Sequence, residues 1–222
     1  MYRSLIFKEW VKTRRFILLS GVAFAALIAY IFLWLAQTIG AMGIVGLWEA
    51  IIGKDFTLVA PLKYLPLAVG VLLAAVQFVP EMQSKRLKLT LHLPLGETRI
   101  ICAMLGYGVA ALLALFAIAA LALAAGLAVR FSREIVLSNI LTALPWLLGG
   151  LQAYLFGAWI CLEPTWRRRI FSAIPAACVV AALYGGAAPG AYASYIPYAL
   201  IFIAASFFFS LHSAARFKDG VQ

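Results

Sequence analysis

A segment of basic residues alternating with leucines, FVPEMQSKRLKLTLHLPLGETR, is the part of this sequence best suited to specific chemistry. Lys85, Arg86 and Lys88 alternate with leucines, which would suggest a strand, but an isolated strand would expose unpaired backbone groups, so a short helix is predicted. Glu81 precedes the basic residues, and Pro94 turns the chain after them. The pattern therefore predicts a mixed basic and leucine surface on the cytoplasmic side of the membrane.

Side chains for catalysis or metal binding are scarce. The two histidines, His92 and His212, and the three cysteines, Cys102, Cys161 and Cys178, stand at no metal-ligand spacing and form no CxxC motif. The HExxH pair of a metalloprotease and the GxxxxGK(S/T) phosphate loop are both absent from the sequence. The sequence therefore predicts no cofactor, no metal and no enzymatic activity in this chain.

The elements that must position the basic segment are apolar. The 222 residues are 65% hydrophobic and 12% charged, against about 45–50% and about 25% in soluble domains. Six runs are long enough to cross about 30 Å of hydrocarbon as helices; they are residues 16–36, 61–80, 99–128, 138–162, 170–188 and 195–213. The predicted fold class is all-α, a single transmembrane domain over residues 1–222 with six transmembrane helices.

Lys and Arg orient these spans. With a cytoplasmic N-terminus, most of the 18 Lys and Arg residues fall in cytoplasmic segments, as the positive-inside rule requires. Both termini are therefore predicted in the cytoplasm of a multi-pass protein of the bacterial inner membrane. The basic clusters flank the spans, which indicates topology and contact with anionic membrane lipids and argues against nucleic acid.

Four segments outside the spans have distinct patterns. Residues 1–15 place Tyr2, Leu5, Ile6 and Trp10 at helical spacing, which predicts an amphipathic interfacial helix; plain flanking sequence is the alternative. The outer segment 37–60 is predicted to be a short helix that acts as a gate or a structural lid. Residues 81–97 form a cytoplasmic loop, and 184–197, rich in Gly, Pro and Tyr, predict an outer re-entrant element.

Small residues indicate where helices approach closely. Gly106 with Ala110, and Gly149, Gly150 and Gly157, have the spacing that lets neighbouring helices pack backbone to backbone. This pattern predicts bundle packing and carries no chemistry.

The layout resembles that of ATP-binding cassette (ABC) transporter permeases of the type-two exporter class. The resemblance rests on six spans with both termini in the cytoplasm, on a basic N-terminal helix and on a short sequence motif. The motif is F-x-x-E, followed by a basic stretch and then by leucines that end in L-P. Members commonly have Gly-Thr where this chain has Leu89-Thr90. The residues of the motif are Phe78, Glu81, Arg86, Leu89, Thr90, Leu91, Leu93 and Pro94.

The resemblance implies a subunit whose motor is a separate protein. Two permease chains, identical or related, would enclose the pathway, and two ABC ATPase subunits would bind ATP and Mg²⁺ below them. Residues 1–15 would be the connecting helix, and Arg167, Arg168 and Arg169 a second inner contact with the ATPase. The implied coupling residues are Glu81, Lys85, Arg86, Leu87, Lys88, Leu89, Thr90, Leu91, Leu93 and Pro94. Spans with few charges suggest export of a hydrophobic or lipid-like substrate.

Two alternatives stay open at this point. A membrane scaffold or assembly factor would recruit a cytoplasmic partner through the same loop without transporting anything. For Arg167 to Arg169, the alternative is that the charges only fix topology.

Overall fold

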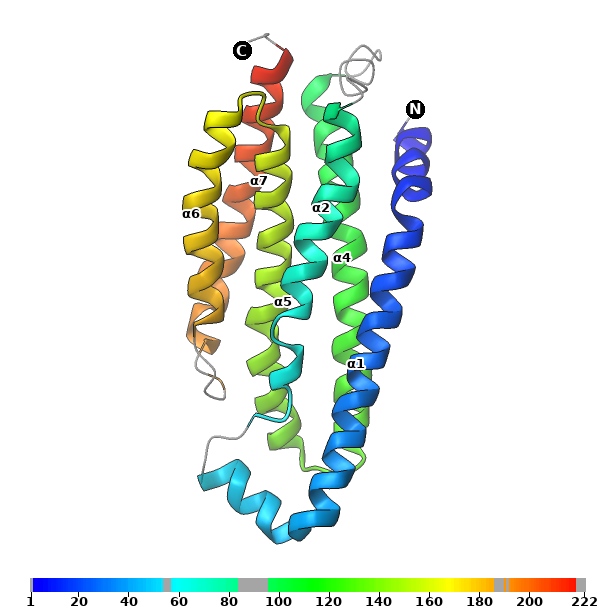
Figure 1. The fold of residues 1–222 in the computed structure, drawn as a ribbon, viewed down its shortest axis with the longest axis vertical. Helices are drawn as coiled ribbons and strands as arrows, with labels where there is room; N and C mark the ends of the chain where they lie inside the picture. The colour runs from blue at the N-terminus through cyan, green and yellow to red at the C-terminus, as the bar shows by residue number, and fades with distance from the viewer. Residues whose placement is uncertain (1, 54–56, 84–95, 186–189, 191, 219–222) are drawn as a thin grey trace.

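The chain folds as a bundle of long helices (Figure 1). The computed structural model describes residues 2–53, 57–83, 96–185, 190 and 192–218, and the secondary structure within them is helical throughout. The helices are α1 (Tyr2–Gly53), α2 (Leu65–Gln83), α4 (Glu97–Ala128), α5 (Arg133–Leu162), α6 (Trp166–Tyr184) and α7 (Ile196–Lys218), with 3₁₀ turns η1 (Ala60–Leu62) and η2 (Ala193–Tyr195). The all-α prediction is confirmed for the described residues.

Five helical segments are long and apolar enough to cross a membrane: Tyr2–Ala41, Ala60–Gln83, Thr98–Ala128, Arg133–Leu162 and Ile196–Ser213. They cover the first four predicted runs and, apart from Tyr195, the last. Helix α6 has 19 residues, and its first turn includes Arg167, Arg168 and Arg169, which shortens its apolar part. Five of the six spans therefore have the required helices, and the crossing by α6 stays a prediction.

The outward face of the bundle is apolar. Leu18, Leu121 and Phe208 are 67–70% exposed, and such side chains would be poorly solvated by water over a large continuous surface. Hydrocarbon solvates them without penalty. The exposure of these leucines and phenylalanines agrees with the membrane assignment.

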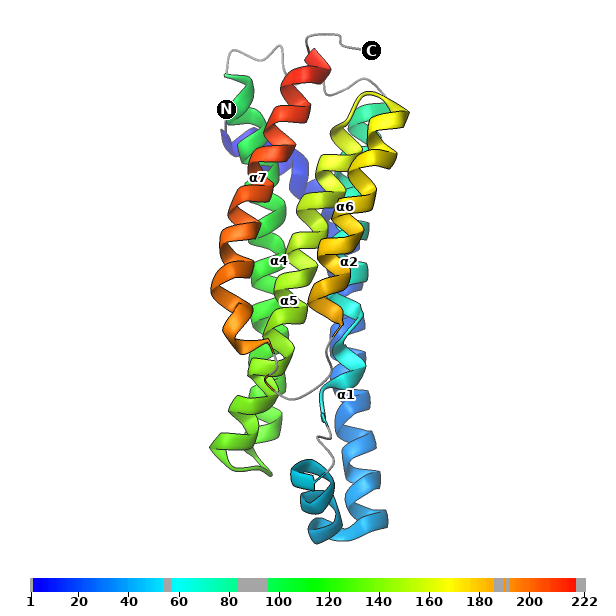
Figure 2. The same cartoon turned by 90° about the vertical axis from the view of Figure 1, so that its left-hand side faces the viewer.

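Helix α5 is the hub of the bundle and packs against α2, α4, α6 and α7 (Figures 1 and 2). Between Thr142 and Phe156 nearly every residue is buried, and Trp146 and Tyr154 are among the largest side chains without exposed surface. A helix that is apolar and buried all round lies at the centre of a bundle. Movement of α5 must therefore displace its neighbours.

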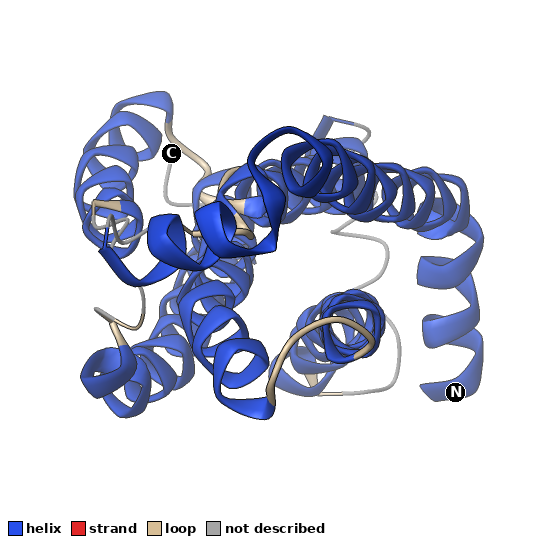
Figure 3. Cartoon of the chain, turned by 90° about the horizontal axis from the view of Figure 1, so that it is seen from below, coloured by secondary structure: helices blue, strands red, loops and turns tan. Residues whose placement is uncertain are grey.

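The N-terminal segment differs in part from its prediction. Residues 2–15 are not a separate helix, because α1 continues through them into the first span. Their direction is distinct, however: the first turns of α1, beside the N mark, lie across the long axis of the bundle (Figures 2 and 3). Leu5, which was grouped with the outward aromatics, is buried at 5% exposure, while Tyr2, Ile6 and Trp10 are each 46% exposed.

The segments at the opposite end are also partly helical. Gly43 has φ 72° and interrupts α1, which then continues to Gly53, so the predicted outer helix is the last part of α1. In segment 184–197, the Gly190 N–H donates to Thr142 Oγ1 at 2.9 Å and Tyr192 donates to the carbonyl of Ala182 at 3.0 Å. Residues 54–56, 186–189 and 191 lie outside the described part of these segments.

Candidate functional site

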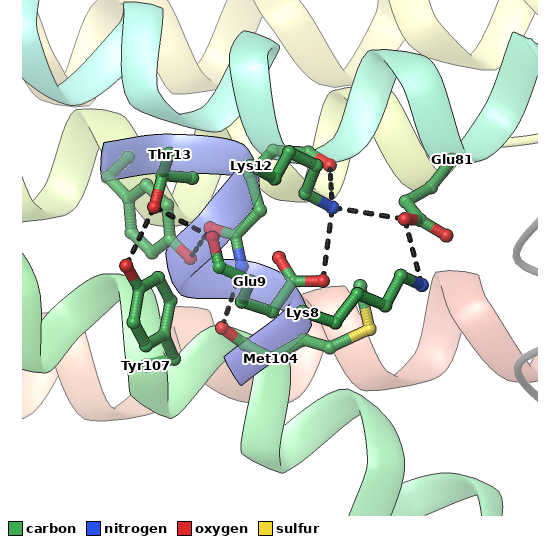
Figure 4. Close-up of polar contacts among 9 residues, drawn as sticks. Lys8, Glu9, Lys12, Thr13, Glu81, Met104 and Tyr107 are labelled. Atoms are coloured by element: carbon green, nitrogen blue, oxygen red, sulfur yellow. Dashed lines mark hydrogen bonds and ion pairs between the residues drawn. The ribbon is translucent and has the colours of Figure 1, made fainter. Parts of the chain in front are cut away.

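Lys12 is the centre of a buried polar cluster at the end of the bundle where α1 begins and α7 ends (Figure 4). We call this the inner end, after the predicted topology. Lys12 Nζ donates to Glu9 Oε1 at 3.0 Å, to Glu81 Oε1 at 3.0 Å and to the backbone carbonyl of Gln77 at 2.9 Å. Lys8 Nζ lies 3.0 Å from the same Glu81 oxygen. Glu9 and Glu81 are 0% and 2% exposed, so both carboxylates depend on these lysines for charge balance.

Hydrogen bonds extend the cluster deeper into the bundle. The hydroxyls of Thr13 and Tyr107 are 2.7 Å apart, and Gln77 accepts a bond from Tyr154 at 2.8 Å and donates one to the Met104 carbonyl at 2.8 Å. These groups come from α1, α2, α4 and α5. The inner polar cluster, as named from here on, consists of Lys8, Glu9, Lys12, Thr13, Gln77, Glu81, Tyr107 and Tyr154.

The composition of the inner polar cluster limits what it can do. It contains two carboxylates and two ammonium groups, and within the described residues no three His, Cys, Asp or Glu side chains are grouped to hold a metal ion. Glu9 Oε2 and Glu81 Oε2 are buried without a hydrogen-bond partner in the described part of the chain. Breaking such buried ion pairs is costly. The bonds of the cluster therefore join α1, α2, α4 and α5.

Glu81 was predicted to begin the coupling loop. The structure places it in the last turn of α2, which passes Pro80 and ends at Gln83, and its side chain contacts Lys8 and Lys12 inside the bundle. Glu81 thus anchors the end of α2 to α1. The other predicted coupling residues lie outside the described residues; they are Lys85, Arg86, Leu87, Lys88, Leu89, Thr90, Leu91, Leu93 and Pro94.

The three arginines of the predicted second contact differ in their surroundings. Arg167 and Arg168 are exposed, whereas Arg169 is half-buried. Arg169 Nε donates to the carbonyl of Glu163 at 2.8 Å, and its guanidinium carbon lies 5.8 Å from the ring centre of Trp166. A cation is favourable at the carbonyl end of a helix. Arg169 therefore caps α5, while the other two arginines remain on the surface.

Replacing Arg169 with alanine is expected to lower the free energy of unfolding by about 1–3 kcal/mol, because a buried carbonyl loses a charged donor. Arg167→Ala is the matched control, since it removes the same side chain two residues away from an exposed position. Its expected effect is within about 0.5 kcal/mol of zero. Equilibrium unfolding by SDS in mixed micelles measures both variants; equal losses would contradict the capping role of Arg169.

A groove of about 490 Å³ lies between α2, the α5–α6 turn and α6. Gln83, a residue of the predicted coupling loop 81–97 and the last one described before position 96, lines one side, and Trp166 and Arg169 line the other. Val79, Met82 and Ile170 make its wall mostly apolar. We call it the inner groove, and it joins the two regions that were predicted to contact a partner.

Sequence reasoning missed most of the inner polar cluster. Only charged residues inside the spans were considered as candidates, so Glu9, Gln77 and Tyr154 were not among the predicted site residues. A signal was present: Glu9 with Thr13, and Gln77 with Glu81, stand four residues apart, which places each pair on one helix face.

Comparison of this chain with known protein families, with characterised proteins and with solved structures finds no match.

Proposed function

We propose that this chain is the transmembrane permease subunit of an ABC transporter, driven by separate ATPase subunits that bind ATP and Mg²⁺. The inner polar cluster supports the proposal most directly. Glu81 begins the predicted coupling loop 81–97 and is tied to α1 through Lys12 and Lys8. Gln77, one turn earlier, is tied to α4 and α5. A force applied to this loop would therefore reach four helices.

The transmission follows from these contacts. ATP binding would draw two ATPases together beneath two permease chains, and each loop would move with its ATPase. Helix α2 would carry that movement to α1 through the Glu81–Lys12 pair and to α5 through the Gln77–Tyr154 bond. Because α5 is packed on all sides, its neighbours would move with it, and the interface between permease chains would open towards the outer leaflet.

A hydrophobic or lipid-like substrate suits the membrane face of the bundle. A groove of about 530 Å³ runs between α2, α5 and α6, with Tyr64 and Tyr184 at one end and small residues such as Gly157 and Ala177 along it. Ile160 and Ala173 line both this side groove and the inner groove. The two grooves are therefore adjacent, with α6, as a sixth span, forming one wall of each. In this proposal both termini are in the cytoplasm of a bacterium and the substrate is exported.

Purification of the tagged full-length chain from its own membrane tests the proposal. The expected co-purifying protein carries a GxxxxGK(S/T) phosphate loop and hydrolyses ATP in complex with this chain. A stable partner without a nucleotide site would contradict the transporter and favour the scaffold. A chain that purifies alone, from membranes in which every neighbouring gene is expressed, would also overturn the proposal.

The double substitution Leu89→Asp, Leu91→Asp is expected to abolish ATP-driven transport while the helices stay folded. Apolar anchors at the centre of an interface contribute most of its binding energy, and two buried carboxylates there would lack partners. Co-purification of the ATPase is therefore expected to fall about tenfold or more. Transport into proteoliposomes and the ATPase recovered per chain are the two measurements.

The matched control places two aspartates at the opposite end of the bundle. Val129 and Leu137 are 82% and 55% exposed, so Val129→Asp, Leu137→Asp adds the same charge without entering the proposed contact. Its ATPase recovery is expected to equal that of the unmodified chain. Unchanged transport by the Leu89, Leu91 variant would rule out the coupling role of the loop.

A further inference from the structure

The inner groove and the side groove follow one another along the same three helices, α2, α5 and α6. Met82 of α2 and Arg169 of α6 line the inner groove, and Val71 of α2 and Ala177 of α6 line the side groove further from the inner end. Ile160 and Ala173 line both. A single elongated molecule can therefore contact both grooves.

Arg169 is the one charged side chain among the described residues that line the inner groove. Its Nε donates to the carbonyl of Glu163 at 2.8 Å, and its Nη2 lies 3.4 Å from the carbonyl oxygen of Cys161. The remaining nitrogen, Nη1, forms no hydrogen bond within the described residues and retains accessible surface. A guanidinium has five N–H donors, so Arg169 can cap α5 and still bind an anion.

The inner groove holds no acidic side chain that could neutralise this guanidinium. No described residue of its lining is Asp or Glu, and no ion pair within the described part of the chain includes Arg169. The carboxylate of Glu163 is buried and accepts a bond from the Ser213 hydroxyl of α7 at 2.7 Å. Arg167 is exposed on the same turn of α6. The charge of the groove is therefore complementary to an anionic ligand.

The position of Arg169 suits the phosphate layer of the inner leaflet. Trp166, which its guanidinium approaches, is 72% exposed, and tryptophan is enriched where a protein meets lipid headgroups. Ala177 follows eight residues later, which is about 12 Å along a helix, and one leaflet contributes about 15 Å of hydrocarbon. A lipid with its phosphate at Arg169 would therefore place an acyl chain along the side groove.

The side groove has the polarity and the width that an acyl chain needs. Its volume is about 530 Å³, within the range of about 300–1,000 Å³ that is usual for small-molecule sites. Gly157, Ala173 and Ala177 leave room between α5 and α6, and Val71 and Leu67 close the side formed by α2. Apolar side chains solvate a hydrocarbon chain without any polar group to satisfy.

We propose that these two grooves bind one anionic phospholipid of the inner leaflet. Its phosphate accepts a hydrogen bond from Arg169 Nη1, and one acyl chain lies in the side groove between α2 and α6. The site shares no residue with the inner polar cluster. It does not rest on the transporter proposal, because a lipid can occupy the grooves whether or not an ATPase moves this chain.

A photoreactive phosphatidylglycerol with a diazirine on one acyl chain tests the site. The full-length chain is placed in phosphatidylcholine nanodiscs that contain a small fraction of this probe. Labelling is expected on the peptides of α5 and α6 that line the side groove. Unlabelled phosphatidylglycerol is expected to compete at a mole fraction about five- to tenfold lower than phosphatidylethanolamine, whose headgroup has no net charge.

Four variants separate the charge from the shape of the site. Arg169→Gln keeps an N–H donor for the Glu163 carbonyl but removes the charge, so the two lipids should compete about equally. Arg168→Gln, the same change at an exposed position outside the lining, should keep the preference. Ala173→Trp fills the place where the grooves meet and should abolish labelling there. Ile174→Trp, at an exposed neighbouring position that lines neither groove, should leave the labelling unchanged.

Five results would overturn the proposal. Three are equal competition by the two lipids in the unmodified chain, a preference that survives Arg169→Gln, and labelling undiminished by Ala173→Trp. The fourth is displacement of the probe by inorganic phosphate alone, which would identify a site for a soluble anion. The fifth is absence of labelling in the grooves, as expected if a protein segment fills them. No assay here uses ATP or a partner protein, so failure would leave the transporter proposal unaffected, and a missing ATPase would leave the lipid site unaffected.

Discussion

Replacing Glu81 with leucine is expected to lower the free energy of unfolding of this protein by about 3–5 kcal/mol, because a buried ion pair then loses one partner. Lys12 would retain only Glu9 as a counter-charge, and Lys8 would lose its acceptor at 3.0 Å. The start of α1 would also lose its charged link to the end of α2. SDS titration in mixed micelles, followed by tryptophan fluorescence, measures the change.

A variant that replaces the whole buried charge group tests the physical reason. Glu9→Leu, Lys12→Met and Glu81→Leu together leave no uncompensated buried charge, and apolar substitutes for a complete buried ion group are often neutral or stabilising. The triple variant is therefore expected to be more stable than Glu81→Leu alone. Glu134→Leu, at an exposed position in the first turn of α5, should change stability by less than about 0.5 kcal/mol. A Glu81→Leu variant as stable as the unmodified chain would contradict the assigned role.

The triple variant also separates stability from transmission. It restores a folded bundle while removing the charged link between α2 and α1. If the proposed coupling is correct, this variant binds the ATPase as the unmodified chain does but transports less. A triple variant with full transport would show that the inner polar cluster serves folding alone.

The positions of the helices could be predicted from the sequence because each span is specified locally. A run of about 20 apolar residues predicts a crossing helix whatever its neighbours are. The run 99–128 corresponds to the segment Thr98–Ala128, and 61–80 lies within Ala60–Gln83. Pro80 was expected to end the second helix, yet α2 continues to Gln83. Proline removes the bond that residue 80 would donate to the Val76 carbonyl, and the helix runs only three residues beyond it.

The inner polar cluster could not be predicted because its bonds join helices that are distant in the sequence. Gln77 and Tyr154 are 77 residues apart, and no local pattern specifies which faces meet. The positions of the charged residues were also misleading. Lys8 and Lys12 were interpreted only as cytoplasmic charges that fix the topology, and Glu9 beside them was not considered. In the structure, Lys8 forms an ion pair with Glu81, and Lys12 forms ion pairs with both Glu9 and Glu81.

The predicted close approaches were correct only in part. A methyl group added to Gly150 would lie 2.6 Å from the carbonyl oxygen of Pro66, and one added to Gly157 would lie 2.8 Å from Ala74 Cβ. Both positions are close contacts, as expected. At Gly106 no atom of a neighbouring helix in the described part of the chain lies within 4 Å of such a methyl group, so that prediction is wrong. Gly70, the partner of Gly150, was missed, although Ala74 stands four positions away, the same spacing as that of Gly106 and Ala110.

Gly70→Ala is expected to cost about 3 kcal/mol or more, at or above the upper end of ordinary overpacking. The added methyl carbon would lie 2.1 Å from the Gly150 carbonyl oxygen and 3.0 Å from its carbonyl carbon. Both atoms are backbone, so no side chain can rotate away, and α2 would have to separate from α5. Since α5 is the hub of the bundle, we expect the folded yield in detergent to fall sharply.

Gly106→Ala supplies the control with the identical chemical change. It lies within α4 and faces open space, so the higher helix propensity of alanine should stabilise the protein by about 0.5–1 kcal/mol. The two variants are therefore expected to differ in sign as well as size in the same SDS titration. If Gly70→Ala were no worse than Gly106→Ala, α2 and α5 would not meet at Gly70 and Gly150. The Gln77–Tyr154 link, which depends on that packing, would then lose its geometric basis.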